Sequence, residues 1–226
     1  MRPTAGAFFD VDETLVRVKS MFHFLEFYLR ERGEPEGTYE KLIAEIRAAA
    51  EQGASRQEIN RSYYRLYAGE RAERVAAGGR AWFAHHLEQD LFIPETLGEL
   101  RQAQVRDEAV VLVSGSFFAC LDPIAAHVGA RWAFGTRPVI RGGELTGEVV
   151  IPLIGPTKGR TAQVAAAVRG LDLARSSAYG DHSSDLPLLS SVGNPVVVGT
   201  DPVLVAHAAA AGWRRLLPAS AHHRQP

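Results

Sequence analysis

The stretch Phe8-Phe9-Asp10-Val11-Asp12-Glu13-Thr14-Leu15 places two carboxylates, one residue apart, directly after a short apolar run. Such a run, bounded by turn-forming residues, is typical of a buried strand, so residues 5–9 are predicted to deliver Asp10 at a strand's carboxyl end. Open α/β sheets place their chemistry there. Two acids this close repel each other unless a cation lies between them, and a hard ion such as Mg²⁺ suits oxygen ligands. The alternative is an Asp-rich turn that caps a strand.

The composition indicates a globular protein that acts on a small, dispersed substrate. The chain has 226 residues, and its 25 basic and 26 acidic residues give a formal net charge of -1, so we expect no nucleic-acid partner. No apolar run approaches the ~20 residues of a membrane span, and the N-terminus has no signal-peptide pattern. The single cysteine, Cys120, is expected to be a packed core thiol in a reducing cytoplasm. The polar tail with His222 and His223 is expected to fray.

The chain divides into a helical block and an α/β core. Apolar residues recur at helical spacing between residues 20 and 89. From Ile93 onward strands alternate with helices, which is typical of a Rossmann-like, mostly parallel sheet with helices on its faces. The prediction is an α/β core over residues 1–16 and 93–226, with a helical cap over residues 17–92 inserted after the first strand. Such an insertion can close over Asp10 as a lid.

Local signals predict several details of these elements. Ser20 is expected to cap the first helix of the insertion, and Ser55-x-x-Glu58 is a capping box for a later one. The helix over residues 75–87 is expected to be interrupted or bent at Gly78-Gly79. Two short strands separated by Gly142-Gly143 are expected to form a hairpin.

Two further motifs fall where a phosphate could bind. Ser114-Gly115-Ser116 follows a buried strand over residues 109–113, where a hydroxyl and backbone amides suit a phosphate group; a serine helix cap is the alternative. Lys158 lies near the start of a helix, whose positive dipole end disfavours a cation unless an anion is held nearby. The alternative is an exposed lysine whose charge solvent screens.

A last motif, Gly180-Asp181-His182-Ser183-Ser184-Asp185, follows another predicted strand. Glycine permits close backbone approach, and Asp181 can reach a metal held by the first motif. Asp185 can bind the ion or orient its other ligands, and a helix cap is a compatible role.

These motifs occur in one order on one kind of fold, and together they resemble the haloacid dehalogenase superfamily of phosphohydrolases. The resemblance rests on Asp10-x-Asp12-x-Thr14, Ser114, Lys158 and Gly180-Asp181-x-x-x-Asp185, and it spans essentially the whole chain. The helical insertion resembles the type 1 (C1) cap of that superfamily. The stretch over residues 179–198 is similar to the subfamily IB hydrolases related to phosphoserine phosphatase.

The resemblance implies a Mg²⁺-dependent phosphatase that hydrolyses a small-molecule phosphate monoester. It assigns Asp10 as the nucleophile that forms an aspartyl-phosphate, and Asp12 as the general acid and base. Lys158 counts as catalytic because, with Ser114 and the amide of Gly115, it is expected to hold the phosphate oxygens. The implied metal ligands are Asp10, Asp12 through its backbone carbonyl, Asp181 and Asp185.

The cap is expected to select the substrate. A phosphoserine phosphatase carries an acid soon after the first motif, but this sequence has Arg17-Val18-Lys19-Ser20 there. Two cations put an ammonium-bearing substrate in doubt and are compatible with an acidic or multiply phosphorylated one. The candidates for substrate selection are Arg17, Lys19, Phe22 and His182. Solvent-facing hinge residues are the alternative for Arg17 and Lys19.

Two rival functions are compatible with parts of this pattern. A phosphomutase or phosphotransferase would form the same aspartyl-phosphate and pass the phosphoryl group to a sugar or alcohol. A non-catalytic phosphometabolite-binding protein would need a lost catalytic residue, and none is missing from the motifs. The sequence leaves open the identity of the small phosphorylated metabolite, its pathway, and whether the protein is a monomer or a homodimer.

Overall fold

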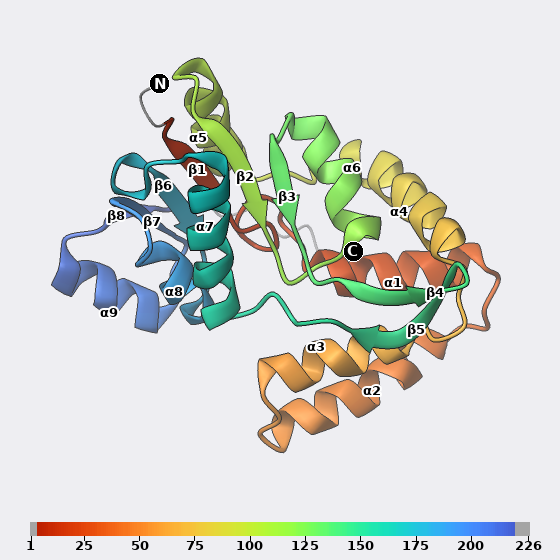
Figure 1. The fold of residues 1–226 in the computed structure, drawn as a ribbon. Coiled ribbons are helices and arrows are strands. Elements are labelled where there is room, and N and C mark those ends of the chain that lie inside the picture. Colours follow the sequence, from red (N-terminus) through yellow and green to blue (C-terminus); the bar gives the residue numbers. More distant parts are fainter. Residues whose placement is uncertain (1–3, 220–226) are drawn as a thin grey trace.

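The computed structural model describes residues 4–219, so the expectation for His222 and His223 lies outside the described residues. Its main sheet is parallel, in the order β3-β2-β1-β6-β7-β8 (Figure 1). The chain winds outward in both directions from β1, which confirms the predicted Rossmann-like α/β core. The strands of this sheet are β1 Gly6–Phe9, β2 Ala109–Val113, β3 Trp132–Phe134, β6 Ser177–Gly180, β7 Asn194–Val198 and β8 Arg214–Leu216.

Both faces of this sheet are buried under helices (Figure 1). Phe9 and Leu112 belong to the apolar cluster on one face, with α5, α6 and the helical insertion, while Phe8 and Val111 face α7, α8 and α9. Successive strand residues point to opposite faces, so two buried faces require the continuous apolar runs seen in the sequence. Cys120 is a buried free thiol, as predicted. The covering helices are α5 Pro94–Val105, α6 Phe118–Val128, α7 Pro156–Arg169, α8 Leu186–Leu189 and α9 Pro202–Ala211.

The helical insertion lies between β1 and α5 in the chain and packs against the core. The ring of Phe117, just before α6, lies 5.9 Å from that of Phe24 and 5.5 Å from that of Tyr67. One apolar cluster therefore joins the insertion to the core. Among the residues that the structure describes, none of the helices combines the length and apolar character that a membrane span requires. The helices of the insertion are α1 Ser20–Glu31, α2 Thr38–Glu51, α3 Arg56–Arg65 and α4 Ala72–Leu87.

The predicted cap of α1 by Ser20 is wrong, the predicted interruption at Gly78-Gly79 does not occur, and the predicted capping box is confirmed. Ser20 does not cap α1, because Lys19 precedes the first helical turn and Ser20 is fully buried, with its hydroxyl donating to Ser116 Oγ at 3.0 Å. Gly78-Gly79 does not interrupt α4, which continues from Ala72 to Leu87. The capping box of Ser55 and Glu58 forms as predicted at the start of α3.

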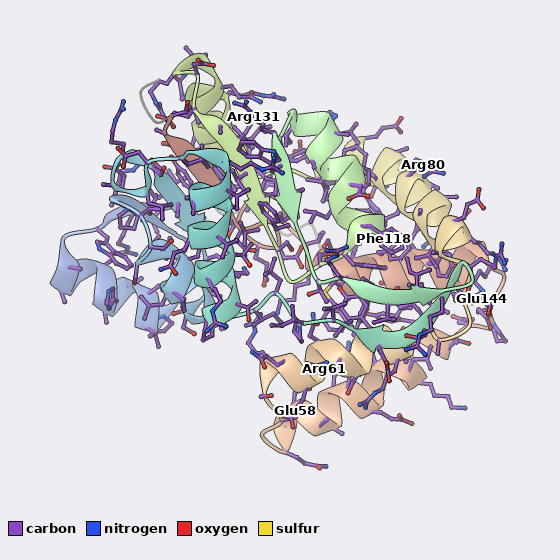
Figure 2. All side chains as sticks on the ribbon, viewed as in Figure 1. Glu58, Arg61, Arg80, Phe118, Arg131 and Glu144 are labelled. Atoms are coloured by element: carbon purple, nitrogen blue, oxygen red, sulfur yellow. The ribbon has the colours of Figure 1, made fainter. Side chains whose placement is uncertain are left out.

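The predicted hairpin forms, but it belongs spatially to the insertion. β4 (Pro138–Arg141) pairs antiparallel with β5 (Glu144–Val149). The Gly69 amide donates to the carbonyl of Leu145, and the Leu145 amide donates to the carbonyl of Glu70, both at 2.8 Å. Arg61, which Figure 2 shows on α3, donates to the carbonyl of Val149 at 3.5 Å. A segment of the predicted core is thus hydrogen-bonded to the insertion.

Replacing Gly79 by alanine should lower the free energy of unfolding by about 1–3 kcal/mol, the usual effect of overpacking. A methyl group at Gly79 would overlap the carbonyl oxygen of Ala119 and force α4 away from α6. Gly98, which is exposed on α5 with nothing near its missing side chain, provides the control. Gly98→Ala should stabilise the protein by ~1 kcal/mol. Denaturant unfolding measures both effects, and equal stabilities for the two variants would contradict this helix contact.

Candidate active site

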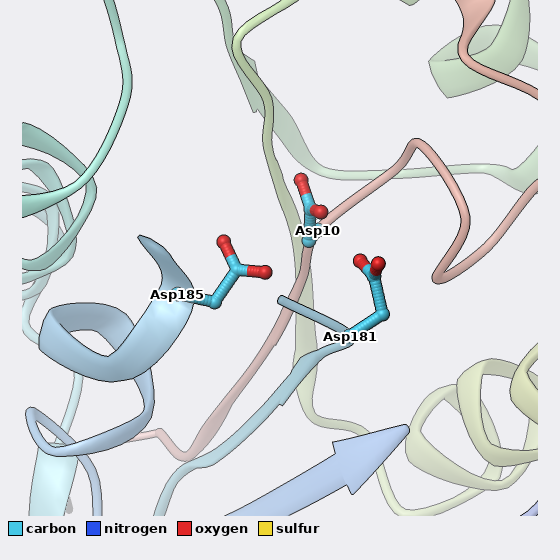
Figure 3. A group of neighbouring side chains, drawn as sticks. All are labelled: Asp10, Asp181 and Asp185. Carbon is cyan, nitrogen blue, oxygen red and sulfur yellow. The ribbon is translucent and has the colours of Figure 1, made fainter. Parts of the chain in front are cut away.

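Three carboxylates converge at the carboxyl ends of β1 and β6 (Figure 3). Asp10 directly follows β1, Asp181 directly follows β6, and Asp185 ends the 3-10 turn before α8. One oxygen of each lies within 4.8 Å of the others. Because β1 and β6 are adjacent and parallel, the residues that follow them meet at one edge of the sheet. The structure thereby brings together three of the four predicted metal ligands.

Lys158 lies between two of these carboxylates. Its Nζ donates to Asp10 Oδ1 and to Asp185 Oδ1, each at 2.6 Å, and its side chain is 6% exposed. α7 begins directly after Gly155, whose φ of 60° is left-handed, and Lys158 lies in the first turn of this helix. The carboxylates supply the anions that a lysine at the positive end of a helix requires. The alternative of an exposed, solvent-screened lysine is therefore wrong.

The charges of this cluster fit a divalent cation. Burial, followed by the charge of Asp185, raises the pKa of Asp10 well above its usual value, and Lys158 opposes this rise. Burial, and then Asp185, also raises the pKa of Asp181 to about 6. Burial would lower the pKa of Lys158, but Asp10 and Asp185 outweigh it and raise this pKa overall. Three carboxylates thus face one ammonium group, and a divalent ion with oxygen ligands would balance the two excess negative charges.

Asp12 lies apart from the carboxylate cluster and borders the same cavity. Its Oδ1 is buried and has no hydrogen-bond partner among the described residues. Burial raises the pKa of Asp12 to about 7, although hydrogen bonds to Ser20 lower it. A carboxyl group in this state can give or take a proton near neutral pH. The Asp12 side chain therefore borders the cavity without joining the carboxylate cluster.

The loop after β2 brings Ser114 and Gly115 to the cavity. Ser114 is 1% exposed, and its Oγ accepts a hydrogen bond from the amide of Ser116 at 3.0 Å, which leaves the hydroxyl hydrogen for another acceptor. The carbonyl of Gly115 accepts from Asn60 and Tyr64, both on α3. The alternative of a serine helix cap is wrong, because α6 has Phe117 at its N-cap position.

The hydroxyl groups of Thr14 and Ser20 form hydrogen bonds with Asp181 and Ser116. The buried Thr14 hydroxyl donates to Asp181 Oδ1 at 2.7 Å and so orients this carboxylate. Ser20 joins the first motif to the loop after β2, because its hydroxyl donates to Ser116 Oγ and Ser20 also lowers the pKa of Asp12. Sequence reasoning missed this role of Ser20, since a serine before an apolar helical run has the pattern of a helix cap.

A cavity of about 370 Å³ lies over these residues, and the insertion supplies much of its wall. Of the four candidates for substrate selection, Lys19, Phe22 and His182 line this cavity. Arg17 is not among its lining residues, and its Nε instead donates to the carbonyl of Asp90 at 3.1 Å. The structure therefore brings three of these four residues to the site.

Charged residues border the cavity. Lys19 Nζ lies 3.5 Å from Glu13 Oε2, and both side chains are exposed. Arg56, the first residue of α3, places its Nη1 2.9 Å from Nε2 of His182. Sequence reasoning missed Arg56 and Asn60, because their position depends on how the insertion packs against the core and no local motif marks it. The one signal that Asn60 offered is that Tyr63 and Tyr64 follow it by three and four residues and so share its face of the helix.

Sequence comparison finds relatives along nearly the whole chain. The chain matches the model of the haloacid dehalogenase-like hydrolase family over residues 7–190. It is 32% identical to the inhibition of morphological differentiation protein of Streptomyces azureus, over 93% of this chain and 77% of that protein. It is 28% identical to a probable phosphatase of Mycobacterium tuberculosis, over 94% of this chain and 75% of that protein. Phosphoserine phosphatase SerB1 of the same species is 29% identical, over 93% of this chain and 70% of that protein.

Solved structures share the fold. A protein of unknown function from Bordetella pertussis Tohama I superposes with a TM-score of 0.85 at 22% identity, over 95% of this chain and 98% of that one. A substrate-bound phosphoserine phosphatase superposes with a TM-score of 0.67 at 21% identity, over 91% of each chain. The fold, the family match and the relatives named as phosphatases confirm the predicted enzyme class, a phosphoric monoester hydrolase. The chain therefore belongs to the haloacid dehalogenase-like hydrolase family.

Proposed function

We propose that the protein is a Mg²⁺-dependent phosphatase that hydrolyses a small-molecule phosphate monoester through an aspartyl-phosphate on Asp10. The observation that carries this proposal is the convergence of Asp10, Asp181, Asp185 and Lys158 at one edge of the sheet, beneath a cavity of about 370 Å³. This volume suits a small metabolite. The relatives named as phosphatases support the reaction class.

Asp10 and Asp12 divide the chemistry between them. A carboxylate oxygen of Asp10 attacks the phosphorus in line with the leaving oxygen, and its new P–O bond forms as the bond to the alcohol breaks. Asp12 gives its proton to the leaving oxygen, so that a neutral alcohol departs. Water then attacks the phosphorus, Asp12 takes a proton from this water, and the bond to Asp10 breaks. The unpartnered Oδ1 of Asp12, beside the same cavity, supports this role.

We assign the phosphate oxygens to Ser114, the amide of Gly115 and the ammonium of Lys158. Ser114 retains a hydroxyl hydrogen for an acceptor because its oxygen already accepts from the amide of Ser116. Lys158 lines the cavity and is held in place by two carboxylates. Fixed donors of this kind stabilise the charge that develops on the transferring phosphoryl group.

We propose Mg²⁺ as the metal and Asp10, Asp181 and Asp185, with the backbone carbonyl of Asp12, as its ligands. All four groups offer oxygen atoms, which is the donor set that Mg²⁺ prefers. The hydroxyl of Thr14 keeps Asp181 oriented toward the other acids. When bound, the ion offsets the negative charge of the carboxylates and the phosphate, so that a carboxylate can approach the phosphorus.

We propose that residues 17–92 act as a cap domain, with residues 1–16 and 93–226 as the catalytic core. The hydrogen bonds between residues 69–72 and the β4–β5 hairpin imply that this hairpin moves together with the cap. The free, buried thiol of Cys120 needs no oxidising compartment, and we propose the cytoplasm as the location.

A screen of the purified protein against phosphorylated metabolites tests this function. The panel includes phosphoserine, histidinol phosphate, sugar phosphates, lysophospholipids and an aryl phosphate. We expect inorganic phosphate to be released from at least one compound, to cease when EDTA removes divalent ions, and to resume when Mg²⁺ is added in excess. Product analysis with and without an added alcohol distinguishes hydrolysis from phosphoryl transfer. Release that is insensitive to EDTA, or no release from any compound, would contradict the proposal.

A further inference from the structure

Asn60, on α3, lines the cavity and carries a buried acceptor oxygen. The residue is 4% exposed and lines the wall that the insertion supplies. Its Nδ2 donates to the carbonyl of Gly115 at 3.1 Å, whereas its Oδ1 is buried and has no hydrogen-bond partner among the described residues. The reaction described above makes no use of this oxygen. A buried amide oxygen without a partner costs free energy unless a ligand supplies a donor.

The surroundings of Asn60 fix the orientation of its amide. If the amide were rotated by half a turn, Oδ1 would face the Gly115 carbonyl oxygen, and two acceptors would lie against each other. The hydroxyl of Tyr64 donates to the same carbonyl at 3.2 Å. Oδ1 is therefore the atom of the amide that is left for a ligand.

The charges around this part of the cavity favour a hydroxyl group over an ammonium group as the donor. Arg56 lies four residues before Asn60 on α3, and residues at this spacing share one face of the helix. Lys19 also lines the cavity, where Glu13 lies 3.5 Å from its Nζ, and none of the described insertion residues that line the cavity is acidic. An ammonium group at Asn60 would approach Arg56, and no described cavity-lining residue of the insertion supplies a carboxylate to offset that repulsion.

We propose that Asn60 Oδ1 accepts a hydrogen bond from a hydroxyl group on the alcohol part of the substrate, and so selects hydroxylated phosphate monoesters. The inference rests on the proposed function, because it takes the amide of Gly115 to hold the phosphate. The carbonyl of the same residue holds Asn60, so the selected hydroxyl lies near the phosphate. We therefore expect the selected hydroxyl on the carbon next to the one that carries the phosphate.

The binding of three related ligands tests this selection without turnover. The ligands are propyl phosphate, 2-hydroxypropyl phosphate and 2-aminopropyl phosphate, and calorimetry measures their Kd with the Asp10→Asn protein in the presence of Mg²⁺. We expect the hydroxylated ligand to bind at least about tenfold more tightly than propyl phosphate, because the latter leaves Oδ1 unpaired. In the Asn60→Leu background this ratio should fall to about one. In the Tyr64→Phe background, which removes the other donor to the Gly115 carbonyl, the ratio should persist.

Each outcome of this experiment decides the proposal. Equal affinities for the hydroxylated and plain ligands, or a ratio that survives Asn60→Leu, would overturn it. Tightest binding of the amino ligand would overturn the choice of a hydroxyl donor. A loss of the affinity ratio in the Tyr64→Phe background would overturn the assignment of the selection to Asn60. Phosphate release by the wild-type protein is measured separately, so a failure of the proposed phosphatase function is distinguishable from a failure of this selection.

Discussion

Asp10→Asn should lower phosphate release by at least ~10³-fold while the protein remains folded. An amide is a far weaker nucleophile than a carboxylate, so the first chemical step loses the group that attacks the phosphorus. Asparagine has nearly the same shape as aspartate, and its amide oxygen can still accept the hydrogen bond from Lys158 that the carboxylate accepts at 2.6 Å. Circular dichroism and thermal unfolding should therefore show a folded protein.

Asp107→Asn is a matched control for this substitution. Asp107 is exposed, lies far from the carboxylate cluster in the chain, and has a φ of 56°, a conformation that asparagine tolerates well. Phosphate release by this control should stay close to the wild-type rate. If Asp10→Asn also kept a rate within tenfold of wild type, Asp10 would not be the nucleophile.

Lys158→Met should reduce phosphate release by ~10²–10³-fold, the typical cost of losing one donor to a developing negative charge. Methionine has a similar length but carries no charge, so Asp10 and Asp185 would face each other without the ammonium that now separates them. The phosphate would also lose a cationic partner. Steady-state kinetics at saturating Mg²⁺ measure this loss.

Lys41→Met controls for the removal of one lysine charge. Lys41 is exposed on α2, and this variant should turn over substrate at close to the wild-type rate. Near wild-type turnover by Lys158→Met would show that the buried contacts of Lys158 are only structural.

The catalytic edge of the core could be predicted from sequence because it follows from local patterns. Asp10 and Asp181 each follow an apolar run, and parallel strands bring the residues at their carboxyl ends to one edge. The charge of Lys158 conflicts with the helix dipole, which left an exposed lysine as an alternative, and the family resemblance assigned this residue to the site. The structure resolves the conflict with two buried carboxylates.

The cavity wall could not be predicted in the same way. Asn60 and Arg56 reach the site only through the packing of α3, which brings Asn60 to the loop after β2 and Arg56 to the loop after β6. No local periodicity specifies these contacts. Ser20 matches the pattern of a helix cap, yet burial beside Asp12 and Ser116 outweighs this preference. The hairpin across Gly142-Gly143 was predicted, but its pairing with the insertion is a long-range contact that the turn residues do not encode.

The aspartyl-phosphate on Asp10 is tested by identifying the residue that carries the phosphoryl group during turnover. Wild-type protein is mixed with a hydrolysed phosphate monoester and Mg²⁺, quenched in acid within the first turnover, digested and examined by mass spectrometry. We expect one phosphoryl group on the peptide that contains Asp10, fragmentation that assigns it to this side chain, and no such peptide from Asp10→Asn. A phosphoryl group on any other residue, or the same modified peptide from Asp10→Asn, would contradict this assignment.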